Sequence, residues 1–548
     1  MAFTDISNLV KTSRPALPQI YAYTTPEIAR HDGWTKIGYT EQNVRERLKQ
    51  QAHTIDVVYK LEWHGNATFE DTGKTFHDTD FHGYLRKLDV RDKPGTEWFE
   101  IEPDPAHVRF YEFRENHGVV EDAPATIEYR LRNEQERASE ETASYARSHE
   151  GGEFLWNAKP RFGKTLTSYD FCKRVGAQKV LIVTNRPAIA NSWYDDYEGF
   201  VGRDSGLVFI SSAPALQGRK YCLTREQYLD GLQKGGPKGF IEFVSLQDLK
   251  GAIDFGGKYD KLEHVANLEW DVLIIDEAHE GVDTFKTDVA FDHIRRKFTL
   301  HLSGTPFKAI ANEKFPEEAI FNWTYADEQK AKRDWDDPEL PNPYADLPRL
   351  NMFTYQMSDI VADEVSRGMD IDGETVEYAF DLNEFFATNE NGYFLHNDDV
   401  DRFLDALTTQ RKFPFSTPEL RDELRHTFWM LNRVDSAKAL AKKLRQHPVF
   451  KDYEIVLAAG DGKLDDDEAS AQAFDKVRKA IAEHDRTITL SVGQLTTGVT
   501  VPEWTAVLML SNMKSPALYM QAAFRAQNPC LFNCGSTFLR KENAYVFD

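Results

Sequence analysis

The stretch FLWNAKPRFGKTLT, residues 154–167, decides the fold of this chain. Its apolar start predicts a buried strand, and a helix-like sequence follows the loop that ends at Gly163, Lys164 and Thr165. In this arrangement the loop N–H groups face a β-phosphate at a helix N-terminus, Lys164 reaches the β- and γ-phosphates, and the Thr165 hydroxyl binds Mg²⁺. The stretch therefore predicts an ATP site with Mg²⁺, and Arg161 of the same loop belongs to it.

The match to the phosphate-loop pattern G-x-x-x-x-G-K-[ST] is complete only at its end. Ala158 stands where the pattern has its first glycine. A lone Gly-Lys-Thr also occurs in ordinary turns, so the nucleotide site depends on what the rest of the chain supplies.

A second apolar strand ends in two carboxylates. The sequence WDVLIIDEAH, residues 270–279, carries Asp276 and Glu277 to the carboxyl end of a strand that lies beside the phosphate loop in a doubly wound sheet. Asp276 is predicted to hold Mg²⁺ through water, and Glu277 to orient the water that attacks the γ-phosphate. His279 follows as a predicted sensor of that phosphate. The alternative, a strand that ends in an acidic turn, assigns these side chains no chemistry.

Further strands complete a pattern of alternating strands and helices. The continuous apolar run within 179–184 suits a parallel sheet that is covered on both faces, and 487–492 is predicted as a further buried strand. The sequence LHLSGTPF, residues 300–307, ends its strand in Ser303 and Thr305, which are predicted to couple nucleotide state to domain motion. The predicted fold class is α/β, with two RecA-like parallel-sheet motor domains.

From about residue 125 to residue 548 these motifs resemble the DEAH-type superfamily 2 helicases, among them the motor subunits of restriction enzymes. The resemblance implies an ATP-driven motor that acts on nucleic acid. It also implies that Gln135 reads the edge of adenine, and that Gly498 in QLTTGVTVP, residues 494–502, couples ATP to the strand.

The last motif departs from the family pattern Gln-x-x-Gly-Arg-x-Gly-Arg. The sequence QAAFRAQN, residues 521–528, keeps Gln521 and Arg525 but has Phe524 in place of a glycine and Asn528 in place of the second arginine. Arg525 is therefore the single arginine-finger candidate of this motif, and which of the two arginine roles it fills stays open.

The N-terminal segment reads as a separate small α+β unit. Strands are predicted at QIYAY (19–23), TKIGYT (35–40) and 97–101, and helices at 43–51 and 78–88. In order and spacing these segments resemble the phage-type branch of the GIY-YIG nuclease family. The resemblance implies a metal-dependent endonuclease.

This resemblance assigns roles to five residues of the unit. Tyr21 and Lys36 stand where the family activates water, and Arg47 stands where it holds the scissile phosphate. Asp78 is the first choice for binding Mg²⁺, and Glu97 is the reserve. Two family positions are altered, Lys36 among them, which keeps open the alternative that the unit binds nucleic acid without cutting it.

We therefore predict a GIY-YIG-like domain at 1–110, a linker at 111–128, a first RecA-like domain at 129–310, a linker with an insertion at 311–420 and a second RecA-like domain at 421–548. The sequence stops within a predicted strand, so a further C-terminal specificity domain or a partner subunit is expected.

Composition bounds the class of protein further. The 548 residues carry a formal net charge of −23, which argues against coating by nucleic acid through bulk charge but leaves room for a local basic groove. The four cysteines suggest reduced thiols, and the sequence shows neither a signal peptide nor an apolar run of membrane-spanning length. We expect a cytoplasmic protein whose partner is nucleic acid, with double-stranded DNA favoured, and not a membrane.

Two substitutions test the predicted nucleotide site. Lys164→Ala should lose most of the affinity for ATP, because the ammonium no longer reaches the phosphates. Glu277→Gln should still bind ATP but hydrolyse it at least about a hundredfold more slowly, because it no longer orients the attacking water. ATP binding and steady-state hydrolysis measure both effects, and normal turnover by Glu277→Gln would contradict the role given to Glu277.

Overall fold

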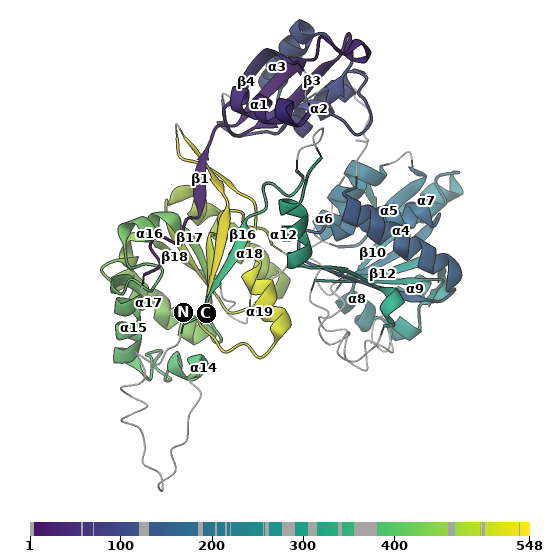
Figure 1. Ribbon diagram of the computed structural model, residues 1–548. Coiled ribbons are helices and arrows are strands. Elements are labelled where there is room, and N and C mark those ends of the chain that lie inside the picture. The colour runs from purple at the N-terminus through teal and green to yellow at the C-terminus, as the bar shows by residue number, and fades with distance from the viewer. Residues whose placement is uncertain are drawn as a thin grey trace.

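The computed structural model contains a small head and two larger domains, each built on its own sheet (Figure 1). The structure describes residues 5–55, 58–69, 71–119, 131–184, 190–202, 205–213, 216, 218–219, 221–255, 257, 262–276, 291–304, 315–337, 342–355, 381–458, 466–493, 495, 499–535 and 537–548. Four predicted site residues, Glu277, His279, Thr305 and Gly498, lie outside these ranges.

The head is an antiparallel four-stranded sheet in the order β4-β2-β3-β5 with three helices. Its elements are β2 (Gln19–Thr24), β3 (Thr35–Thr40), α1 (Val44–Ile55), β4 (Lys60–Asn66), α2 (Asp78–Lys87), β5 (Trp98–Phe99) and α3 (Pro103–Asn116). Alternation along β2 sends Ile20 and Ala22 into one apolar cluster and Tyr21 and Tyr23 into another. Both faces of the sheet are therefore covered.

The predicted linker at 111–128 starts too early, because the head does not end at residue 110. Helix α3 begins at Pro103 and continues to Asn116, and it buries Phe110 and Phe113 against the sheet. Proline suits the first turn of a helix, where its missing N–H would have no partner in any case. Pro103 therefore opens a helix of the head and does not end it.

The first motor domain is built on an eight-stranded sheet in the order β15-β6-β14-β12-β7-β10-β8-β9, whose paired strands are all parallel. Its strands are β6 (Glu153–Ala158), β7 (Lys179–Thr184), β8 (Leu207–Ser211), β9 (Cys222–Leu223), β10 (Gly239–Ser245), β12 (Val272–Asp276), β14 (Thr299–Ser303) and β15 (Ile320–Trp323). Its helices are α4 (Asn133–Ser148), α5 (Lys164–Arg174), α6 (Ala190–Asp196), α7 (Arg225–Gln233), α8 (Leu246–Gly251) and α9 (Glu263–Asn267). A short separate pair joins β11 (Glu269–Trp270) to β13 (Arg295–Arg296).

The second motor domain has a six-stranded parallel sheet in the order β16-β23-β20-β17-β19-β18. Its strands are β16 (Arg349–Phe353), β17 (His426–Met430), β18 (Glu454–Ala458), β19 (Thr487–Ser491), β20 (Ala506–Met509) and β23 (Asn543–Phe547). Its helices are α14 (Leu382–Phe385), α15 (Asn397–Thr409), α16 (Pro418–Glu423), α17 (Val434–Gln446), α18 (Asp466–Glu483) and α19 (Pro516–Ala523). The predicted α/β class with two parallel-sheet domains and a small α+β head is confirmed.

Where the structure describes residues 311–420, they do not form the predicted linker with an insertion. β15 pairs with β6 of the first sheet, and β16 pairs with β23 of the second. Helix α12 (Tyr325–Arg333) lies between the two domains (Figure 1), and α15 packs Phe403 and Leu407 into the core of the second domain. Each segment completes a sheet or core whose other members are distant in sequence, so local composition alone gave no sign of it.

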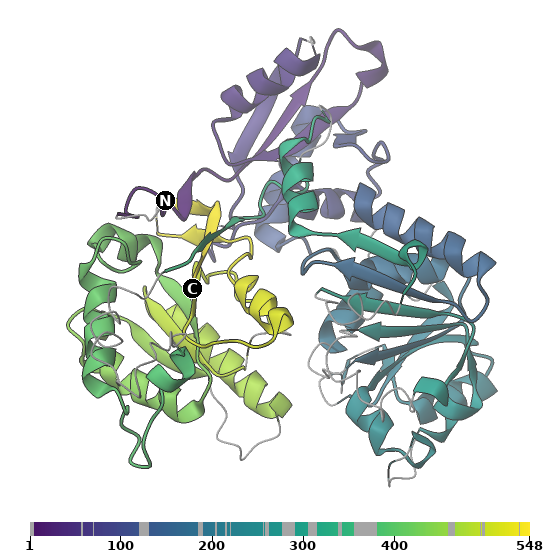
Figure 2. The same ribbon diagram turned by 60° about the horizontal axis from the view of Figure 1, so that its bottom comes forward.

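The N-terminal boundary of the head is also different from the prediction. Ile6 and Val10 are buried in the core of the second motor domain. β1 (Ser13–Ala16) pairs antiparallel with β22 (Phe538–Lys541), which pairs in turn with β21 (Leu531–Asn533). The described residues before β2 therefore belong with the second motor domain, and the head begins at β2 (Figures 1 and 2). None of the helices formed by the described residues is long and apolar enough to cross a membrane.

His426 makes the second motor domain sensitive to acid. Burial in β17 lowers the pKa of His426 from 6.5 to about 4. The unfolded chain takes up a proton near pH 6.5 that the folded chain takes up only near pH 4, so stability falls as the pH drops through this window.

His426→Gln should reduce the free energy of unfolding that is lost at acid pH by up to about 3 kcal/mol. The measurement is the shift of the unfolding midpoint between neutral pH and the acid end of that window. His484→Gln, which changes an exposed histidine, is the matched control. Equal acid sensitivity in the wild type and both variants would contradict the prediction.

Candidate functional site

The phosphate loop joins β6 to α5, as the sequence predicted. Arg161 and Gly163 both take positive φ, 72° and 85°. A Cβ on Gly163 would lie 2.4 Å from the Gln135 side-chain nitrogen, so only glycine fits there. Lys164 opens α5, and its ammonium donates to the carbonyl of Ala158 at 2.9 Å, across the mouth of the loop.

Gln135 shapes the loop instead of lying free beside it. Its amide nitrogen donates to the carbonyl of Phe162 at 2.7 Å, and its amide oxygen accepts from the N–H of Arg132 at 2.9 Å. The Arg132 guanidinium donates to the same Phe162 carbonyl at 2.6 Å. In this conformation one end of the Gln135 amide holds the loop and the other caps α4, and its reading of adenine stays a prediction.

Asp276 and Ser303 end neighbouring strands at the edge where the phosphate loop begins. β14 lies between β6 and β12, with Ser303 opposite Asn157. The Asp276 carboxylate is buried and accepts from the Trp193 indole N–H at 3.0 Å. The carboxyl ends of parallel strands share one edge of the sheet. This carboxylate therefore lies on the same edge as the phosphate loop and Thr165 at its end.

The residues present fit ATP with Mg²⁺. The donors are the Thr165 hydroxyl and the Asp276 carboxylate, and oxygen is the ligand type that Mg²⁺ prefers. Gly163 is the N-cap of α5, and a helix N-terminus is a place where anions bind.

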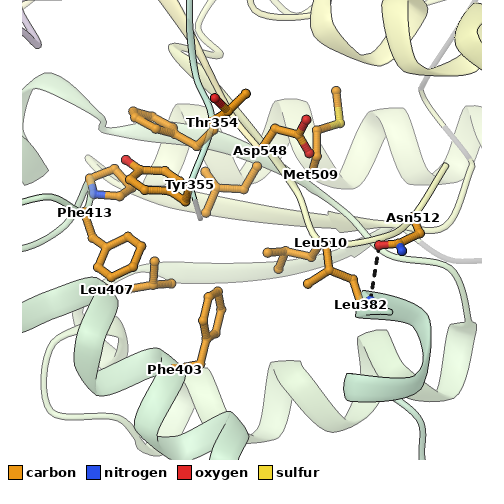
Figure 3. Close-up of a pocket in the computed structure, with 13 residues that line it drawn as sticks. Thr354, Tyr355, Leu382, Phe403, Leu407, Phe413, Met509, Leu510, Asn512 and Asp548 are labelled. Carbon is orange, nitrogen blue, oxygen red and sulfur yellow. Dashed lines mark hydrogen bonds between the residues drawn. The ribbon is translucent and has the colours of Figure 1, made fainter. Parts of the chain in front are cut away.

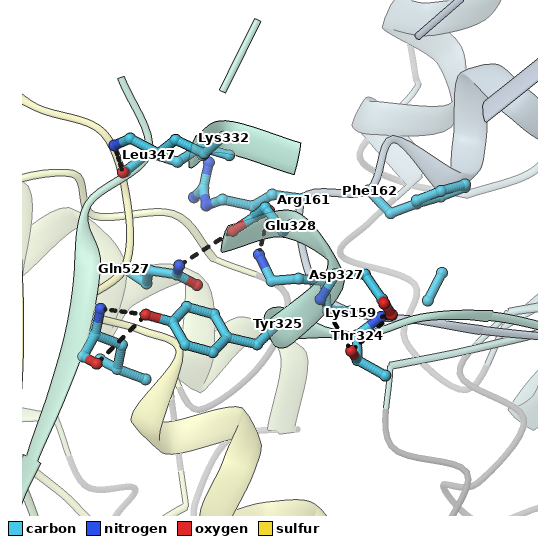
Figure 4. A network of polar contacts seen from close by, with 12 residues as sticks. Lys159, Arg161, Phe162, Thr324, Tyr325, Asp327, Glu328, Lys332, Leu347 and Gln527 are labelled. Carbon is cyan, nitrogen blue, oxygen red and sulfur yellow. Dashed lines mark hydrogen bonds and ion pairs between the residues drawn. The ribbon is translucent and has the colours of Figure 1, made fainter. Parts of the chain in front are cut away.

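A buried ion pair ties the phosphate loop to the helix between the two motor domains (Figure 4). The Lys159 ammonium lies 2.7 Å from a Glu328 carboxylate oxygen, and both side chains are only 3% exposed. The other Glu328 oxygen accepts from the Gln527 amide at 3.3 Å, and the same amide donates to the Pro348 carbonyl at 3.1 Å. The loop, α12 and the second domain thus meet at one carboxylate.

The second domain contributes further contacts at this interface. The Arg161 guanidinium lies 3.5 Å from the Thr500 hydroxyl. Arg525 donates to the carbonyls of Gln521 and Val499, both within its own domain. The structure therefore brings the phosphate loop against the segment after residue 498, and the finger role of Arg525 stays a prediction.

The five predicted residues of the head form one polar cluster. The Lys36 ammonium lies 3.7 Å from Glu97, which hydrogen bonds Asp78, and Arg47 donates to the Tyr21 hydroxyl. Apart from Arg47, which is half-buried, all are buried.

Gly38 permits this close grouping. A Cβ at Gly38 would lie 2.8 Å from the Tyr21 hydroxyl oxygen and 3.4 Å from a Glu97 oxygen. The glycine of the Lys36-Ile37-Gly38 sequence therefore leaves room for both side chains against β3.

Burial and the neighbouring Asp78 carboxyl hold the pKa of Glu97 well above its usual range, although Lys36 and Arg47 act against them. Burial also raises the pKa of Tyr21. Among the described residues no group of three or more His, Cys, Asp or Glu side chains could hold a metal ion. Asp78 and Glu97 offer two carboxylates, which fit one divalent cation whose remaining ligands are water or phosphate oxygens.

Sequence reasoning missed Trp193, Lys159, Glu328 and Gln527. Lys159 was visible within the loop, but nothing local connects it to a glutamate 169 positions later. Trp193 could have been suspected, because a tryptophan on a helix after a central strand is placed to reach the strand edge. Gln527 stands where the helicase motif has its second glycine, and that departure from the pattern was its signal.

An apolar cavity of about 330 Å³ lies elsewhere, at the carboxyl ends of β20 and β23 (Figure 3). Phe403, Leu407 and Phe413 form much of its wall, and Asn512 and Asp548 lie at its margin. None of the predicted site residues lines it.

Two protein families match separate parts of the chain. Residues 128–308 match the family described as "Type III restriction enzyme, res subunit", and residues 19–112 match the "T5orf172 domain". The first range contains the phosphate loop and Asp276, and the second contains the whole polar cluster of the head. The chain is thus similar to a restriction-enzyme subunit over its first motor domain and to the T5orf172 domain over its head.

A protein of Mycoplasma pneumoniae, described as "Putative type II restriction enzyme and methyltransferase RM.MpnORF110P C-terminus", is 26% identical over 482 residues. The alignment covers 77% of this chain and 64% of that protein, so the chain spans less than two thirds of its relative.

Two solved structures align at lower similarity. The ATP-dependent Type ISP restriction-modification enzyme LlaBIII bound to DNA is 16% identical with a TM-score of 0.46, over 76% of this chain and 27% of that one. The Sulfolobus solfataricus SWI2/SNF2 ATPase core in complex with double-stranded DNA is 15% identical with a TM-score of 0.31, over 78% and 89%.

Proposed function

We propose that this chain is an ATP-driven translocase of double-stranded DNA whose head is a Mg²⁺-dependent endonuclease of the GIY-YIG kind, acting in the restriction of foreign DNA. The observation that carries the motor is the shared edge of the first sheet, where the loop at Gly163–Thr165 and the Asp276 carboxylate lie one strand apart. DNA as substrate follows from the restriction-enzyme description of the family and of the relative.

In the motor, Lys164 is proposed to leave the Ala158 carbonyl and bind the phosphates of ATP. Thr165 and Asp276 would hold Mg²⁺, with Asp276 kept in place by Trp193. The cation, when bound, neutralises charge that develops on the phosphates. Glu277 orients the water, and Arg525 approaches the phosphates only when the second domain closes on the first. Ser303, Thr305, His279 and Gly498 are proposed to pass nucleotide state to the DNA-binding surface.

In the head, Arg47 is proposed to hold the scissile phosphate. Burial raises the pKa of Tyr21, so its neutral hydroxyl is suited to orient the attacking water, and the Lys36 ammonium is proposed to contact the phosphate. The water oxygen bonds to phosphorus while one of its protons passes to solvent, the phosphorus–oxygen bond to the leaving sugar breaks, and the leaving oxygen takes up a proton from solvent. Asp78 and Glu97 would hold a divalent cation, which would supply stabilisation of the charge on that leaving oxygen.

Trp193→Phe tests the motor site without touching a proposed ligand of the nucleotide. Loss of the indole N–H releases one Asp276 oxygen, so the Mg²⁺ concentration for half-maximal ATP hydrolysis should rise about tenfold or more. Trp270→Phe is the matched control, because its buried indole donates to the Val265 carbonyl away from the loop. An unchanged Mg²⁺ dependence in Trp193→Phe would contradict the role of Asp276.

Arg47→Ala tests the head. It should abolish Mg²⁺-dependent cleavage of supercoiled plasmid and leave ATP hydrolysis unchanged, because the guanidinium is proposed to bind only the scissile phosphate. Lys36→Ala and Asp78→Ala should likewise abolish cleavage.

Arg45→Ala, an exposed arginine two positions earlier on α1, is the matched control and should cleave normally. If all three cluster variants nick plasmid at the wild-type rate, the head is not the nuclease. If the wild type binds DNA through the head but never cuts it, the head is a binding module.

A further inference from the structure

Strand β22 holds the head with one residue and the second motor domain with the next. Successive side chains of a strand point to opposite sides, so Arg540 and Lys541 face different partners. β22 also pairs residue by residue with β1, and only two residues separate β1 from the first strand of the head. Figure 1 shows β1 descending from the head beside the C-terminal strands.

Lys541 faces the motor. Its ammonium is buried and donates to the carbonyls of Trp504 at 2.9 Å and Ala526 at 3.1 Å, and to the carbonyl of Pro502. Three acceptors match the three protons of the ammonium. These carbonyls belong to the segment that includes Thr500, which contacts the phosphate loop, and to the segment that carries Arg525.

Arg540 faces the head. Its guanidinium donates from Nε to Glu41 at 2.9 Å and makes a second contact from Nη2, and both side chains are only 6% exposed. Glu41 follows β3 directly, and it also accepts from the Tyr39 hydroxyl at 2.9 Å and pairs with Arg14 at 3.1 Å. This buried bidentate contact fixes the end of β3, the strand that carries Lys36.

A second branch leads from Arg540 to the helix that carries Asp78. Asp346, in the segment between the motor domains, lies 3.8 Å from Arg540 and 3.9 Å from His77. His77 caps α2, whose first residue is Asp78, and its ring packs on Tyr39 with centroids 4.3 Å apart. Arg540 is thus connected to both sides of the head cluster.

We propose that β22 couples the motor to the head. Arg540, bound to Glu41, is a positioning residue that sets the separation of α2 and β3 and thereby the alignment of the cleavage site. This separation depends on the nucleotide state of the second motor domain. The proposal rests on the proposed function. It assigns Arg540 no contact with substrate. Removal of either partner leaves the other charge buried without its partner. The contact should therefore hold β3 in one position relative to β22, which an exposed surface pair would not do.

The test compares the wild type with Glu41→Gln and Arg540→Met in the full chain. Plasmid cleavage is measured with Mg²⁺ alone, with ATP and with adenylyl-imidodiphosphate, and ATP hydrolysis is measured in parallel. The wild type should cleave at different rates in the three nucleotide conditions. In each variant the ratio between the fastest and the slowest of these rates should be smaller by about tenfold or more, while the rate of ATP hydrolysis is unchanged. Arg540→Lys, which keeps the charge, should restore part of the difference. Arg91→Met, which removes an exposed ion pair within the head, should behave as the wild type.

Hydrogen exchange along α2 gives a second measurement that does not need cleavage. In the wild type, adenylyl-imidodiphosphate should change protection of residues 78–87, and in Glu41→Gln it should not. If Arg540→Met fails to fold, Glu41→Gln carries the comparison, because it removes a charge at nearly constant shape.

The outcomes separate the two proposals. Nucleotide-dependent cleavage and exchange that persist in Glu41→Gln and Arg540→Met, while Arg47→Ala still abolishes cleavage, would overturn the coupling and keep the nuclease. A wild type that never cleaves would overturn the nuclease, and exchange along α2 would then decide the coupling alone. A wild-type α2 whose exchange ignores nucleotide would overturn the coupling in either case.

Discussion

The arrangement of the two motor domains depends on the buried ion pair between Lys159 and Glu328. Two charges removed from water are costly unless they are paired and hydrogen bonded, and either one left alone costs more still. The phosphate loop and α12 supply the two charges, and Gln527 of the second domain donates to the other Glu328 oxygen. The loop is therefore held in part by residues that the chain supplies much later, and one of them contacts the second domain.

Much of the motor fold could be predicted because its central strands are buried on both faces. In β7, Val180 and Ile182 enter one core and Leu181 and Val183 the other, which leaves a continuous apolar run in the sequence. β12 has the same character, so the residue at its end stood out as a polar side chain delivered to the sheet edge. Local sequence was sufficient to predict a strand and its terminal site residue wherever one continuous segment contains both the strand and the loop that follows.

The rest could not be predicted, because its identity depends on partners far away in the chain. β15 and β16 are short, and each is defined by the strand it joins. The residues before β2 gave no sign that they complete the second domain. In the head, the resemblance named the five polar residues, but only the fold shows that Glu97 contacts Asp78 and Lys36 together. Pairings of this kind are properties of the packed molecule and leave no local pattern.

These long-range contacts share one consequence for how the parts can move. The first domain holds its own sheet through local crossovers, whereas Ile6 and Val10 complete the core of the second and β1 pairs with β22 beside it. The head follows β1 in the chain. It contacts this strand region through the Glu41–Arg540 pair and through the hydrogen bond from Asn533 to the Gly73 carbonyl. A rotation of the second domain about α12 would carry this platform with it. The head is therefore attached to the second domain, and a nucleotide-driven closure of that domain would act on its polar cluster at the ends of β3 and α2.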